Sequence, residues 1–450
     1  MYKRSYIFLY SAYLFLLFPF TICHATNLVL PLANSTFSHS YKGTKVYLYS
    51  QGSYFKSIDT SYANKIGIIG FGGKGKYKRL QFQQELFYST YEKIIYLKAQ
   101  ELFLNYKPWF IGQKKHLWSW ADLLWNNNLW QAEFYQNPVQ AVSMGLLGLH
   151  WQKEYKKWSY YIFFSPVFLP RYSSHLSITS NTIQSFTPWR QSAPVRFNDL
   201  PILYKLNDFS ASQLLTKHSI ALQLNYKLPL SFFVRSAFAY KPSNAIYLGL
   251  KPVASAKALN VNIKPYTVQE SLATVEGGVK NPSWSLLLSA THRSFKNSKD
   301  TEAGYFFDKL SNVFLYNLYY SINNNNNYSV FTSYQKVLGY TAKSYSQYIQ
   351  LKENLFSYPY NYLDAVTLGF KIVNLFNIFG VDYNLRATYD FKQQASILVS
   401  HLLWRPKPEI EILFNVTNFY KNKSVAYNSN YFLHRFAKNH FIQMGVKYVF

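Results

Sequence analysis

The chain has 450 residues, and 47 lysines and arginines stand against 20 aspartates and glutamates, so its formal net charge is +27. Aromatic residues make up 20% of the sequence, which excludes an extensively disordered chain. The basic residues are scattered rather than gathered into basic runs, which argues against a nucleic-acid-binding protein. Beyond residue 25 no stretch of 18 apolar residues occurs, so a bundle of membrane-spanning helices is excluded as well.

The first residues have the layout of a secretory signal peptide. Lys3 and Arg4 give a positive start, an apolar run follows over 6–22, and Cys23 and Ala25 place small residues at positions −3 and −1 of a cleavage site. We therefore predict that a signal peptide is removed after Ala25. A retained membrane anchor is the alternative, but the apolar run is shorter than a typical membrane span. Cleavage removes the single cysteine, so the mature chain is expected to form no disulfide.

From about Val46 onward the dominant hydrophobic period is two, in segments of about ten residues separated by clusters of Asn, Gly, Pro, Ser and Lys. The clearest segment is 381–391, where Val, Tyr, Leu, Ala and Phe alternate with Asp, Asn, Arg and Thr. This period predicts β-strands that have one apolar and one polar face. The same alternation is found over 80–88, 219–227, 284–293 and 409–417.

Both a soluble β-sandwich and a transmembrane β-barrel produce such strands, because each has one apolar face. Three features favour the barrel. The segments have about the length that a tilted strand needs to cross a bilayer. Aromatic residues recur at the segment ends, where the aromatic girdles of a barrel lie. The third feature is the last segment of the sequence.

Ile442, Met444, Val446, Tyr448 and Phe450 form an unbroken apolar set at period two that closes on an aromatic residue. This pattern resembles the C-terminal signature of Gram-negative outer-membrane β-barrels, in which the last strand is read by the barrel-assembly machinery. The resemblance implies an all-β protein of the cell outer membrane, folded as a transmembrane antiparallel up-and-down β-barrel. It also implies outer-membrane lipid and the barrel-assembly machinery as partners.

The predicted organisation is one barrel domain over 26–450 after the signal peptide over 1–25. With about 24 residues for each strand and its share of turn, this length predicts 14 to 18 strands. The Asn323–Asn327 run predicts a turn, because Asn tolerates left-handed backbone. Two longer stretches, Arg171–Asp208 and Ala254–Glu270, are expected to be loops, either of which can fold into the lumen as a constriction or plug.

Enzymatic motifs are missing from the sequence. It has no HExxH, GxSxG, CxxC or phosphate-binding Gly-Lys-Ser/Thr motif, and its ten histidines lack the spacing of metal ligands. We therefore expect no catalysis, no cofactor and no metal. An outer-membrane hydrolase stays as an alternative, because a Ser, a His and an acid can meet in space without a sequence motif.

Seven of the ten tryptophans lie between Trp109 and Trp158. Within this region the stretch over 112–130 loosely resembles the Gly-Arg-Gln…Trp-Gly-x-x-Asp stretch of several large porin-like barrels. It departs from that pattern at Gln113, where Arg is expected, and at Lys114, where Gln is expected. The resemblance implies a porin-like barrel or a capsule- or polysaccharide-handling barrel without choosing between them.

Clustered tryptophans among Asn, Asp and Gln can stack on sugar rings and hydrogen-bond their hydroxyl groups. Tryptophan also forms the interfacial girdle of membrane proteins. We favour the girdle for Trp109, Trp151 and Trp158 and leave both roles open for the others. The candidate glycan-stacking residues are Trp118, Trp120, Trp125 and Trp130.

Charged residues on the polar phase of the strands are expected to project into the lumen, where Arg and Lys favour the passage of anions. AT-rich codon usage is another source of many of the lysines, but it does not explain the shortage of Asp and Glu, so anion preference is favoured. The candidate pore-lining residues are Arg79, Glu85, Arg235, Arg293, Lys371, Asp382, Arg386 and Asp390.

The sequence thus favours an outer-membrane porin-like channel for the passive passage of small hydrophilic, preferably anionic, solutes. In this hypothesis Arg235, Arg293 and Arg386 set the selectivity. The alternative is a surface polysaccharide-binding or capsule-assembly barrel whose lumen is plugged by its loops. The solute or glycan, the openness of the lumen, the strand number and the oligomeric state stay open at this point.

Overall fold

The computed structural model describes the chain from residue 45 to residue 450, apart from short internal stretches. The predicted signal peptide over 1–25 lies outside the described residues. The internal stretches that are also outside them are 56–64, 136, 140, 174–175, 180, 186–188, 190–194, 198, 208–210, 297–304, 306–309, 325–327, 341–359, 376–379, 423 and 425–430.

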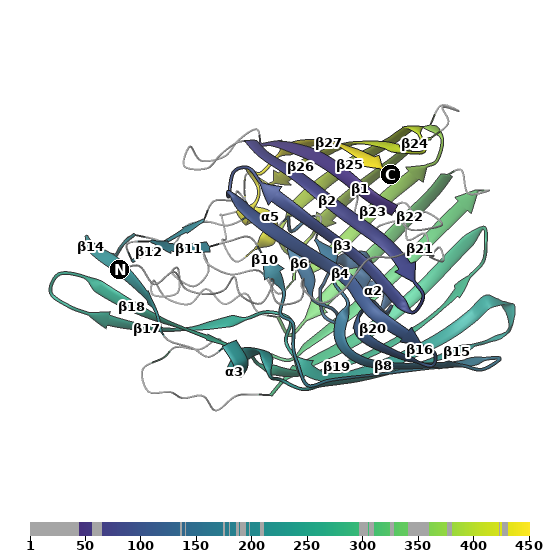
Figure 1. Cartoon of the computed structure of the whole chain (residues 1–450), viewed down its shortest axis with the longest axis horizontal. Coiled ribbons are helices and arrows are strands. Elements are labelled where there is room, and N and C mark those ends of the chain that lie inside the picture. The colour runs from purple at the N-terminus through teal and green to yellow at the C-terminus, as the bar shows by residue number, and fades with distance from the viewer. Residues whose placement is uncertain are drawn as a thin grey trace.

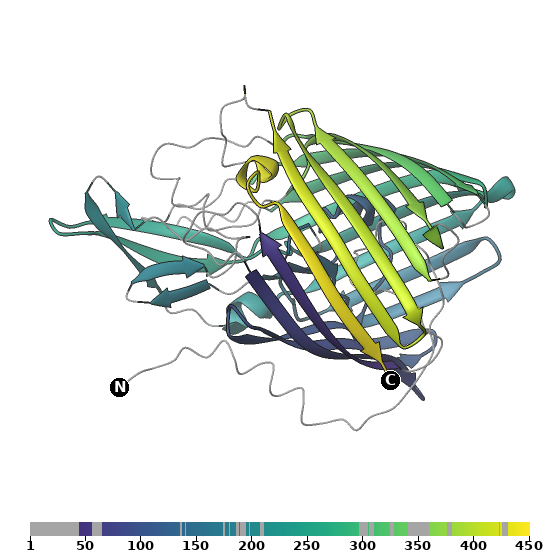
Figure 2. The ribbon, with the colours of Figure 1, turned by 90° about the horizontal axis from the view of Figure 1, so that it is seen from above.

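Eighteen antiparallel strands of the described chain form one closed sheet (Figures 1 and 2). Each strand pairs with the next one in this set along the chain, in an up-and-down order. The strands are β1 (Lys45–Phe55), β2 (Lys65–Tyr77), β3 (Leu80–Ser89), β4 (Ile94–Tyr106), β5 (Trp109–Lys114), β8 (Leu146–Glu154), β9 (Trp158–Ser165), β15 (Ser219–Lys227), β16 (Phe232–Pro242), β19 (Gln269–Lys280), β20 (Trp284–Phe295), β21 (Val313–Asn324), β22 (Tyr328–Leu338), β23 (Asp364–Ile372), β24 (Val381–Asp390), β25 (Ala395–Lys407), β26 (Ile410–Lys421) and β27 (Phe441–Val449).

The barrel closes between its first and last strands. β27 pairs with β1 from Tyr47 opposite Val449 to Phe55 opposite Phe441, and Figure 2 shows the two strands side by side. This closure confirms the predicted all-β, up-and-down barrel, and the strand number falls at the upper end of the predicted range. Of the Asn323–Asn327 run that was expected to form a turn, Asn323 and Asn324 belong to β21, and the other three residues lie outside the described residues.

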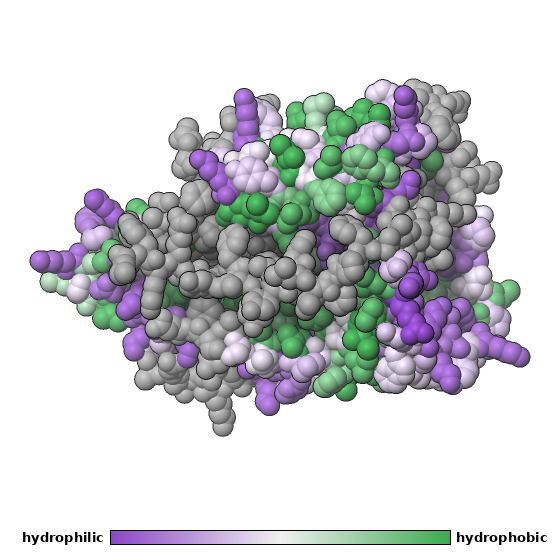
Figure 3. Space-filling model, in the orientation of Figure 1, coloured by the Kyte–Doolittle hydropathy of each residue, from purple (hydrophilic) through white to green (hydrophobic). Residues whose placement is uncertain are grey.

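The outer face of the wall is apolar. In β21, Phe314, Tyr316 and Leu318 are exposed, whereas Leu315 and Asn317 between them are buried. Figure 3 shows apolar residues on the barrel wall and hydrophilic residues towards both ends of the molecule. A closed sheet has no free edge, which is what the hydrocarbon of a membrane requires of spanning strands. The chain is therefore a transmembrane β-barrel and not a soluble sandwich.

No helix in the described part of the chain is long and apolar enough to cross a membrane. Three short elements lie in the long connections between wall strands. They are β10 (Tyr172–Ser173), α3 (Ala211–Leu215) and α5 (Phe432–Arg435).

The two ends of the barrel differ in the length of their connections. Short turns, such as those over 78–79, 107–108, 155–157 and 408–409, lie at the end that is on the right in Figure 1. Long connections lie at the other end. In outer-membrane-type barrels the short turns face the periplasm and the long loops face the outside of the cell.

Two long connections build a small sheet that projects beyond the barrel, at the left of Figures 1 and 2. Ile202, Val261 and Ile263 are buried in its own apolar core. The Ala254–Glu270 stretch, expected as a loop able to enter the lumen, instead forms a turn and a strand of this sheet, because its alternating residues pair with the 200–206 strand. The strands are β13 (Arg196–Phe197), β14 (Leu200–Leu206), β17 (Tyr247–Ala254) and β18 (Leu259–Tyr266), beside a hairpin of β11 (Leu176–Thr179) and β12 (Thr182–Ser185).

Candidate functional site in the barrel lumen

The stretch over 115–145, which we call the inner segment, joins β5 to β8 and lies inside the barrel. It contains α2 (Trp120–Trp125), β6 (Glu133–Tyr135) and β7 (Val142–Ser143). Its contacts are with lumen-facing side chains of wall strands that are far away in sequence, including Gln223, Glu276 and Gln335. Figure 1 places α2 within the outline of the barrel. The inner segment therefore narrows the lumen.

Local sequence explains where α2 begins and ends. Ser119 has extended backbone and its hydroxyl accepts a hydrogen bond from the Asp122 N–H at 3.1 Å, which is an N-cap. Asn126 adopts left-handed backbone, with φ of 55°, and ends the helix. The Asp122 carboxylate then accepts hydrogen bonds from the backbone N–H groups of Leu129 and Trp130. A helix of six residues is not stable alone, so its position depends on the wall.

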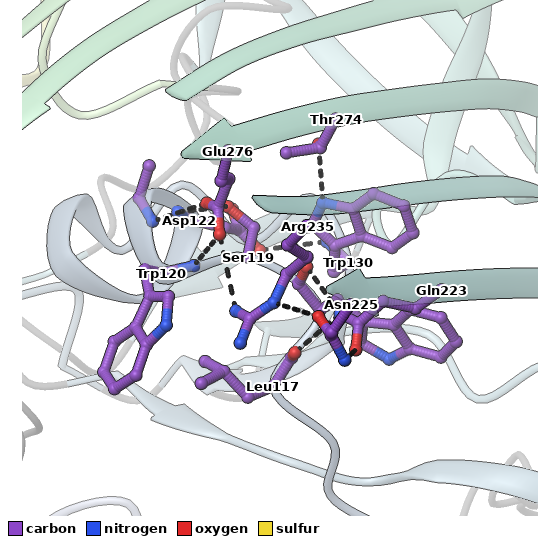
Figure 4. A network of polar contacts seen from close by, with 12 residues as sticks. Leu117, Ser119, Trp120, Asp122, Trp130, Gln223, Asn225, Arg235, Thr274 and Glu276 are labelled. Carbon is purple, nitrogen blue, oxygen red and sulfur yellow. Dashed lines mark hydrogen bonds and ion pairs between the residues drawn. The ribbon is translucent and has the colours of Figure 1, made fainter. Parts of the chain in front are cut away.

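Glu276 of β19 fixes the start of α2 (Figure 4). Its carboxylate accepts hydrogen bonds from Ser119 Oγ at 2.6 Å, from the Trp120 N–H at 3.1 Å and from the Ala121 N–H at 3.2 Å. The first N–H groups of a helix have no partner within the helix and carry partial positive charge. A buried carboxylate from the wall therefore satisfies both the geometry and the charge of this helix end.

Three further wall residues support the same region. Arg235 lies 3.4 Å from the Glu276 carboxylate, and its Nε donates to Asn225 Oδ1 at 2.7 Å (Figure 4). Gln223 Nε2 donates to the backbone carbonyls of Leu117 and Trp118 at 2.8 and 2.9 Å. The stretch before the helix is thus held through its backbone carbonyls, so this contact does not depend on the side chains of that stretch.

Tryptophan side chains fill the space between the inner segment and the wall. Trp118 and Trp130 stack with ring centroids 5.3 Å apart, and both are 1% exposed. The Trp130 indole also donates to Thr274 Oγ1 at 3.2 Å. Trp125 is buried against Tyr362. These three rings are covered by protein and present no face on which a sugar can stack.

Trp120 is the fourth of the predicted glycan-stacking residues, and its surroundings differ. Its indole ring is only partly buried and points away from the wall network in Figure 4. The Arg235 guanidinium lies 5.9 Å and the Lys280 ammonium 5.0 Å from its ring centroid. The cluster of four therefore does not form one sugar-binding surface in this structure.

Further contacts hold the middle of the inner segment. Asn127 Nδ2 donates to Gln335 Oε1 at 2.7 Å. Asn244, in the connection after β16, donates to the backbone carbonyls of Asn128 and Leu129. The segment is thus attached to β15, β19 and β22, and its first residue, Lys115, also donates to Glu101 and Gln100 of β4.

A buried ionic cluster lies behind Asn244. Glu270 accepts from Lys241 at 2.9 Å and from Arg293 Nη2 at 2.6 Å. Arg293 also donates to the hydroxyl groups of Tyr360 and Ser243. All three charged side chains are buried, and each has an opposite charge in contact. The cluster ties three wall strands to two long connections.

The opposite side of the lumen is lined by β1 to β4. Glu85 is ion-paired with Lys98 and accepts from the Tyr47 hydroxyl at 2.9 Å. The Tyr47 ring lies over Gly72 of β2, where an added Cβ would be 2.5 Å from the ring. A cavity of about 90 Å³ lies between part of this wall and the inner segment, with Glu85, Tyr47 and Asn137 among its lining residues, and beside it Phe134 of the inner segment packs directly on Phe87 and Tyr96.

Burial shifts the pKa values of ionisable groups in the inner segment. It raises the pKa of Asp122 to about 6, although the backbone N–H groups that donate to this carboxylate act in the opposite direction. Burial raises the pKa of Glu133 well above its ordinary value and lowers that of His116 well below it. It lowers the pKa of Lys115 to about 8. Asp122 and Lys115 therefore titrate near neutral pH.

Two of the predicted pore-lining cations face the lumen without an ion pair to any acid in the described part of the chain. Lys371 and Arg386 are half-buried on the inward phase of β23 and β24. The positive charge of Arg386 lowers the pKa of Tyr362, which burial raises, and the Tyr362 ring contacts Trp125 of α2.

The other predicted pore-lining residues are neutralised or lie elsewhere. Asp382 is ion-paired with Arg405. Asp390 is buried and accepts from the Leu363 N–H, so it holds a connection rather than lining a path. Arg79 is exposed in the short turn before β3, with its guanidinium 4.6 Å from the ring centroid of exposed Tyr106. Arg79 thus lies on the outer side of the rim, because turn residues do not follow the strand period.

Sequence reasoning did not single out the residues that hold the inner segment, namely Glu276, Gln223, Thr274 and Gln335. One signal was present: Glu276 is one of only 20 acidic residues and alternates with apolar residues of its strand. The inner segment itself was also missed. The expected lumen loops were Arg171–Asp208 and Ala254–Glu270, of which the first places Trp189 against Phe55 of the wall.

The fold and this lumen define a transmembrane β-barrel of the outer-membrane type. No group of three or more His, Cys, Asp or Glu that is able to hold a metal occurs among the described residues.

No family model matches the sequence, and no curated protein matches it. Among solved structures the chain is similar to OccAB4 of Acinetobacter baumannii, with 12% identity and a TM-score of 0.47 over 90% of this chain and 97% of that one. It is also similar to OccK11 (OpdR) of Pseudomonas aeruginosa, with 9% identity and a TM-score of 0.44 over 90% and 95%. A mutant of Rh. blastica porin shows 10% identity and a TM-score of 0.38 over 90% and 99%.

Proposed function

We propose that the protein is an outer-membrane, porin-like channel for the passive passage of small hydrophilic solutes, preferably anions. The observation that carries this proposal is the inner segment, which is attached to β15, β19 and β22 and leaves a cavity beside β1 to β4. A narrowed lumen with polar walls passes small solutes and excludes large ones.

The charge balance of the lumen supports the preference for anions. Several acidic side chains of its wall are paired with bases, as Glu85 is with Lys98 and Glu411 is with Lys447 at 3.0 Å. Lys371 and Arg386 add positive charge that no described ion pair offsets. Of the three arginines proposed to set selectivity, Arg386 is therefore the one that we retain.

The test is the conductance of the refolded mature chain in a planar bilayer under a KCl gradient. Steady openings with a reversal potential of anion-selective sign are expected. Insertion into the bilayer without conductance would overturn the channel proposal. Conductance with a cation-selective sign would overturn only the preference for anions.

The polysaccharide-binding alternative is less well supported, because Trp118, Trp125 and Trp130 are covered by protein. A hydrolase is not supported by the histidines whose partners are described here. His116 contacts Gln223 and His150 contacts the Tyr161 hydroxyl, and neither of these partners is the Ser, Thr or Cys nucleophile that a hydrolase pairs with its histidine base. We therefore propose no catalysis and no cofactor for this lumen.

Export and assembly complete the proposal. A signal peptide over 1–25 would direct the chain out of the cytoplasm. The five apolar residues of the last segment, Ile442, Met444, Val446, Tyr448 and Phe450, are all exposed on the outer face of the wall, where the assembly machinery can read them. Replacement of Phe450 by Ser is expected to lower the amount of assembled barrel in the outer membrane. An unchanged amount would argue against this role.

A further inference from the structure

Exposed cations gather along part of the rim at the short-turn end of the barrel. Four successive turns carry them, namely those between β2 and β3, β4 and β5, β8 and β9, and β15 and β16. We call this set the rim arc. Its residues are Lys78, Arg79, Lys107, Lys153, Lys156, Lys157 and Lys227, all of which are exposed.

Backbone hydrogen bonds place these turns side by side. The Asn105 N–H donates to the Arg79 carbonyl at 2.7 Å, which joins the first two turns. The Gln152 N–H donates to the Pro108 carbonyl at 2.9 Å, and the Lys227 N–H donates to the Lys157 carbonyl at 2.8 Å. The cations therefore form one continuous patch of like charge. Glu154 is the one acidic residue of these turns, and Gln152 donates to it at 2.9 Å.

The cations lie beside exposed aromatic rings rather than over the lumen. The Arg79 guanidinium lies 4.6 Å from the Tyr106 ring centroid, and Lys153 Nζ lies 5.0 Å from that of Tyr155. Both tyrosines are exposed, and the exposed side chain of Trp109 follows Tyr106 after one turn. Aromatic rings next to Lys and Arg mark the level of the lipid headgroups in membrane proteins.

The turn between β15 and β16 adds an apolar contact at the same end. Leu230 has left-handed backbone, with φ of 57°, and is 82% exposed. A bulky residue rarely adopts this backbone, and here it turns an apolar side chain outward at the rim. Such a side chain loses its exposure to water only by entering the interfacial layer of a membrane.

The rest of the short-turn rim has a different character within the described chain. Lys280, at the end of β19, is exposed, and its ammonium lies 5.0 Å from the ring centroid of Trp120 in the lumen. Lys407 is exposed, but Glu409 lies in the same turn. Exposed cations also occur at the long-loop end, as at Lys93, Lys296 and Lys392, so what distinguishes the rim arc is seven exposed cations on four neighbouring turns, next to exposed Tyr106 and Tyr155. Together, the positive charge, the aromatic rings and the exposed leucine indicate which kind of partner the rim arc binds.

We infer that the rim arc binds the headgroups of anionic phospholipids, such as phosphatidylglycerol, in the leaflet that contacts the short turns. Cations near an anionic membrane surface are attracted to it, and the attraction falls with ionic strength. The inference needs only that the barrel spans a membrane, so it is independent of whether the lumen conducts. It gives the large positive charge of this chain a second role besides the lumen.

Tryptophans next to the rim arc report the lipids around it. Trp109 and Trp158 are exposed on the wall, and Trp151 contacts Trp109. In a protein with Trp284 and Trp404 replaced by Phe, these three are the outward-facing tryptophans of the described wall. The full chain is refolded into phosphatidylcholine vesicles that contain brominated phosphatidylglycerol or brominated phosphatidylcholine, and quenching of fluorescence gives the relative association constant of the two lipids.

We expect phosphatidylglycerol to be preferred by about fivefold at low salt, which is the effect of about one cation near an anionic surface. The matched variants each remove four positive charges by Lys→Gln replacement. The rim variant, which carries K107Q, K153Q, K156Q and K157Q, is expected to lose the preference. The control variant, which carries K205Q, K251Q, K257Q and K264Q in the projecting sheet, is expected to keep it.

Equal quenching by the two lipids in the starting protein would overturn the inference, and so would an equal loss in both variants. Equal quenching is the result expected if the rim arc instead binds a soluble acidic partner. If the rim variant does not refold, the same measurement is made on the starting protein in 0.5 M NaCl. Screening by salt should remove most of its preference for phosphatidylglycerol. A preference that is unchanged by salt would also overturn the inference.

Discussion

The Glu276 carboxylate and the Ser119 hydroxyl, which are 157 positions apart in the chain, lie 2.6 Å apart at the start of α2. The same carboxylate accepts hydrogen bonds from the N–H groups of Trp120 and Ala121. A wall strand thus supplies the partner that the helix lacks, so the position of the inner segment depends on its contacts with β19.

Replacement of Glu276 by Ala should release the inner segment. The substitution leaves three donors without an acceptor and Arg235 without its counter-charge, and loss of one partner of a buried pair costs about 3–5 kcal/mol. We expect larger fluctuations of the open-channel current in single-channel recordings. Gln at this position keeps one acceptor oxygen, so its effect should be smaller.

The matched control for this change is Glu411→Gln. Glu411 is also a buried wall carboxylate, paired with Lys447 at 3.0 Å, but its ion-pair partner is another wall strand rather than the inner segment. Its replacement should leave the fluctuations unchanged. Equal fluctuations in the two Glu variants would mean that the contact with α2 does not hold the inner segment.

Ion selectivity should depend on Arg386 and Lys371. Each Glu substitution changes the lumen charge by two units, and a unit charge about 4 Å from an ion in water is worth about 1 kcal/mol, or about fivefold in the ratio of permeabilities. We expect the reversal potential under a KCl gradient to move toward potassium selectivity. A reversal potential that does not move in either variant would exclude these two residues from the ion path.

Arg79→Glu is the control for the selectivity measurement. Arg79 was predicted to line the pore, but it lies over Tyr106 on the outer side of the rim. In a bilayer of neutral lipid its replacement should leave the reversal potential unchanged. A shift as large as that of the Arg386 variant would contradict the assignment of Arg386 to the lumen.

The attachment of the inner segment should weaken as the pH rises from 5 to 7. The pKa of Asp122 is raised to about 6 in the folded chain, so the attached state binds a proton that the released state, with a pKa near 3.8, does not. Its contribution is therefore fully present below pH 3.8 and is lost as the pH rises through about 6. A difference of about two pKa units corresponds to about 3 kcal/mol.

Current fluctuations of the channel measure this effect. They should grow between pH 5 and pH 7 in the starting protein, and the growth should shrink in Asp122→Asn. Glu133 titrates in the same direction, because burial raises its pKa as well, so D122N combined with E133Q should flatten the profile further. The exposed Asp199 of the projecting sheet, changed to Asn, should keep the original profile. If the pH profile of D122N matched that of the Asp199→Asn control, the prediction would be refuted.

Two glycines of β2 should be intolerant of side chains. A Cβ at Gly70 or Gly72 would lie 2.5 Å from the ring of Tyr49 or Tyr47, and overpacking of this kind costs about 1–3 kcal/mol. Replacement of either glycine by Ala should lower the free energy of unfolding in a urea titration of the refolded barrel. Gly52→Ala is the control, since an added Cβ there meets nothing within 4 Å. Equal values for all three variants would show that the rings move aside freely.

Much of the wall could be predicted from the sequence. In a strand, residues two apart share a face, so the alternation over 381–391 and at the end of the chain assigns the lipid side and the lumen side from local spacing alone. The exposed positions of β27 and the buried Thr388 and Asp390 lie on the sides that this rule predicts. The rule works because it depends only on neighbours in the chain.

The content of the lumen could not be predicted in the same way. Of the expected inward loops, the one over 171–208 places Trp189 against Phe55 and Phe441 of the wall, and the one over 254–270 belongs to the projecting sheet, whereas the Trp-rich stretch over 115–145 carries α2 inside the barrel. Polar and irregular composition is common to all of them. What distinguishes the inner segment is its fit to Glu276 and Gln335, which lie in strands far along the chain.

The sequence by itself determined the barrel, its approximate strand number and the phase of each strand, because these follow from period-two spacing and segment length. Only the tertiary structure decided which charged side chains are neutralised by a partner and which are not. Arg293 and Arg386 occupy the same polar phase, yet Arg293 is buried against Glu270, whereas Arg386 has no described acidic partner. The cross-strand register sets which charges meet, and whether a charge is cancelled depends on a neighbour that the chain brings close only when the barrel closes.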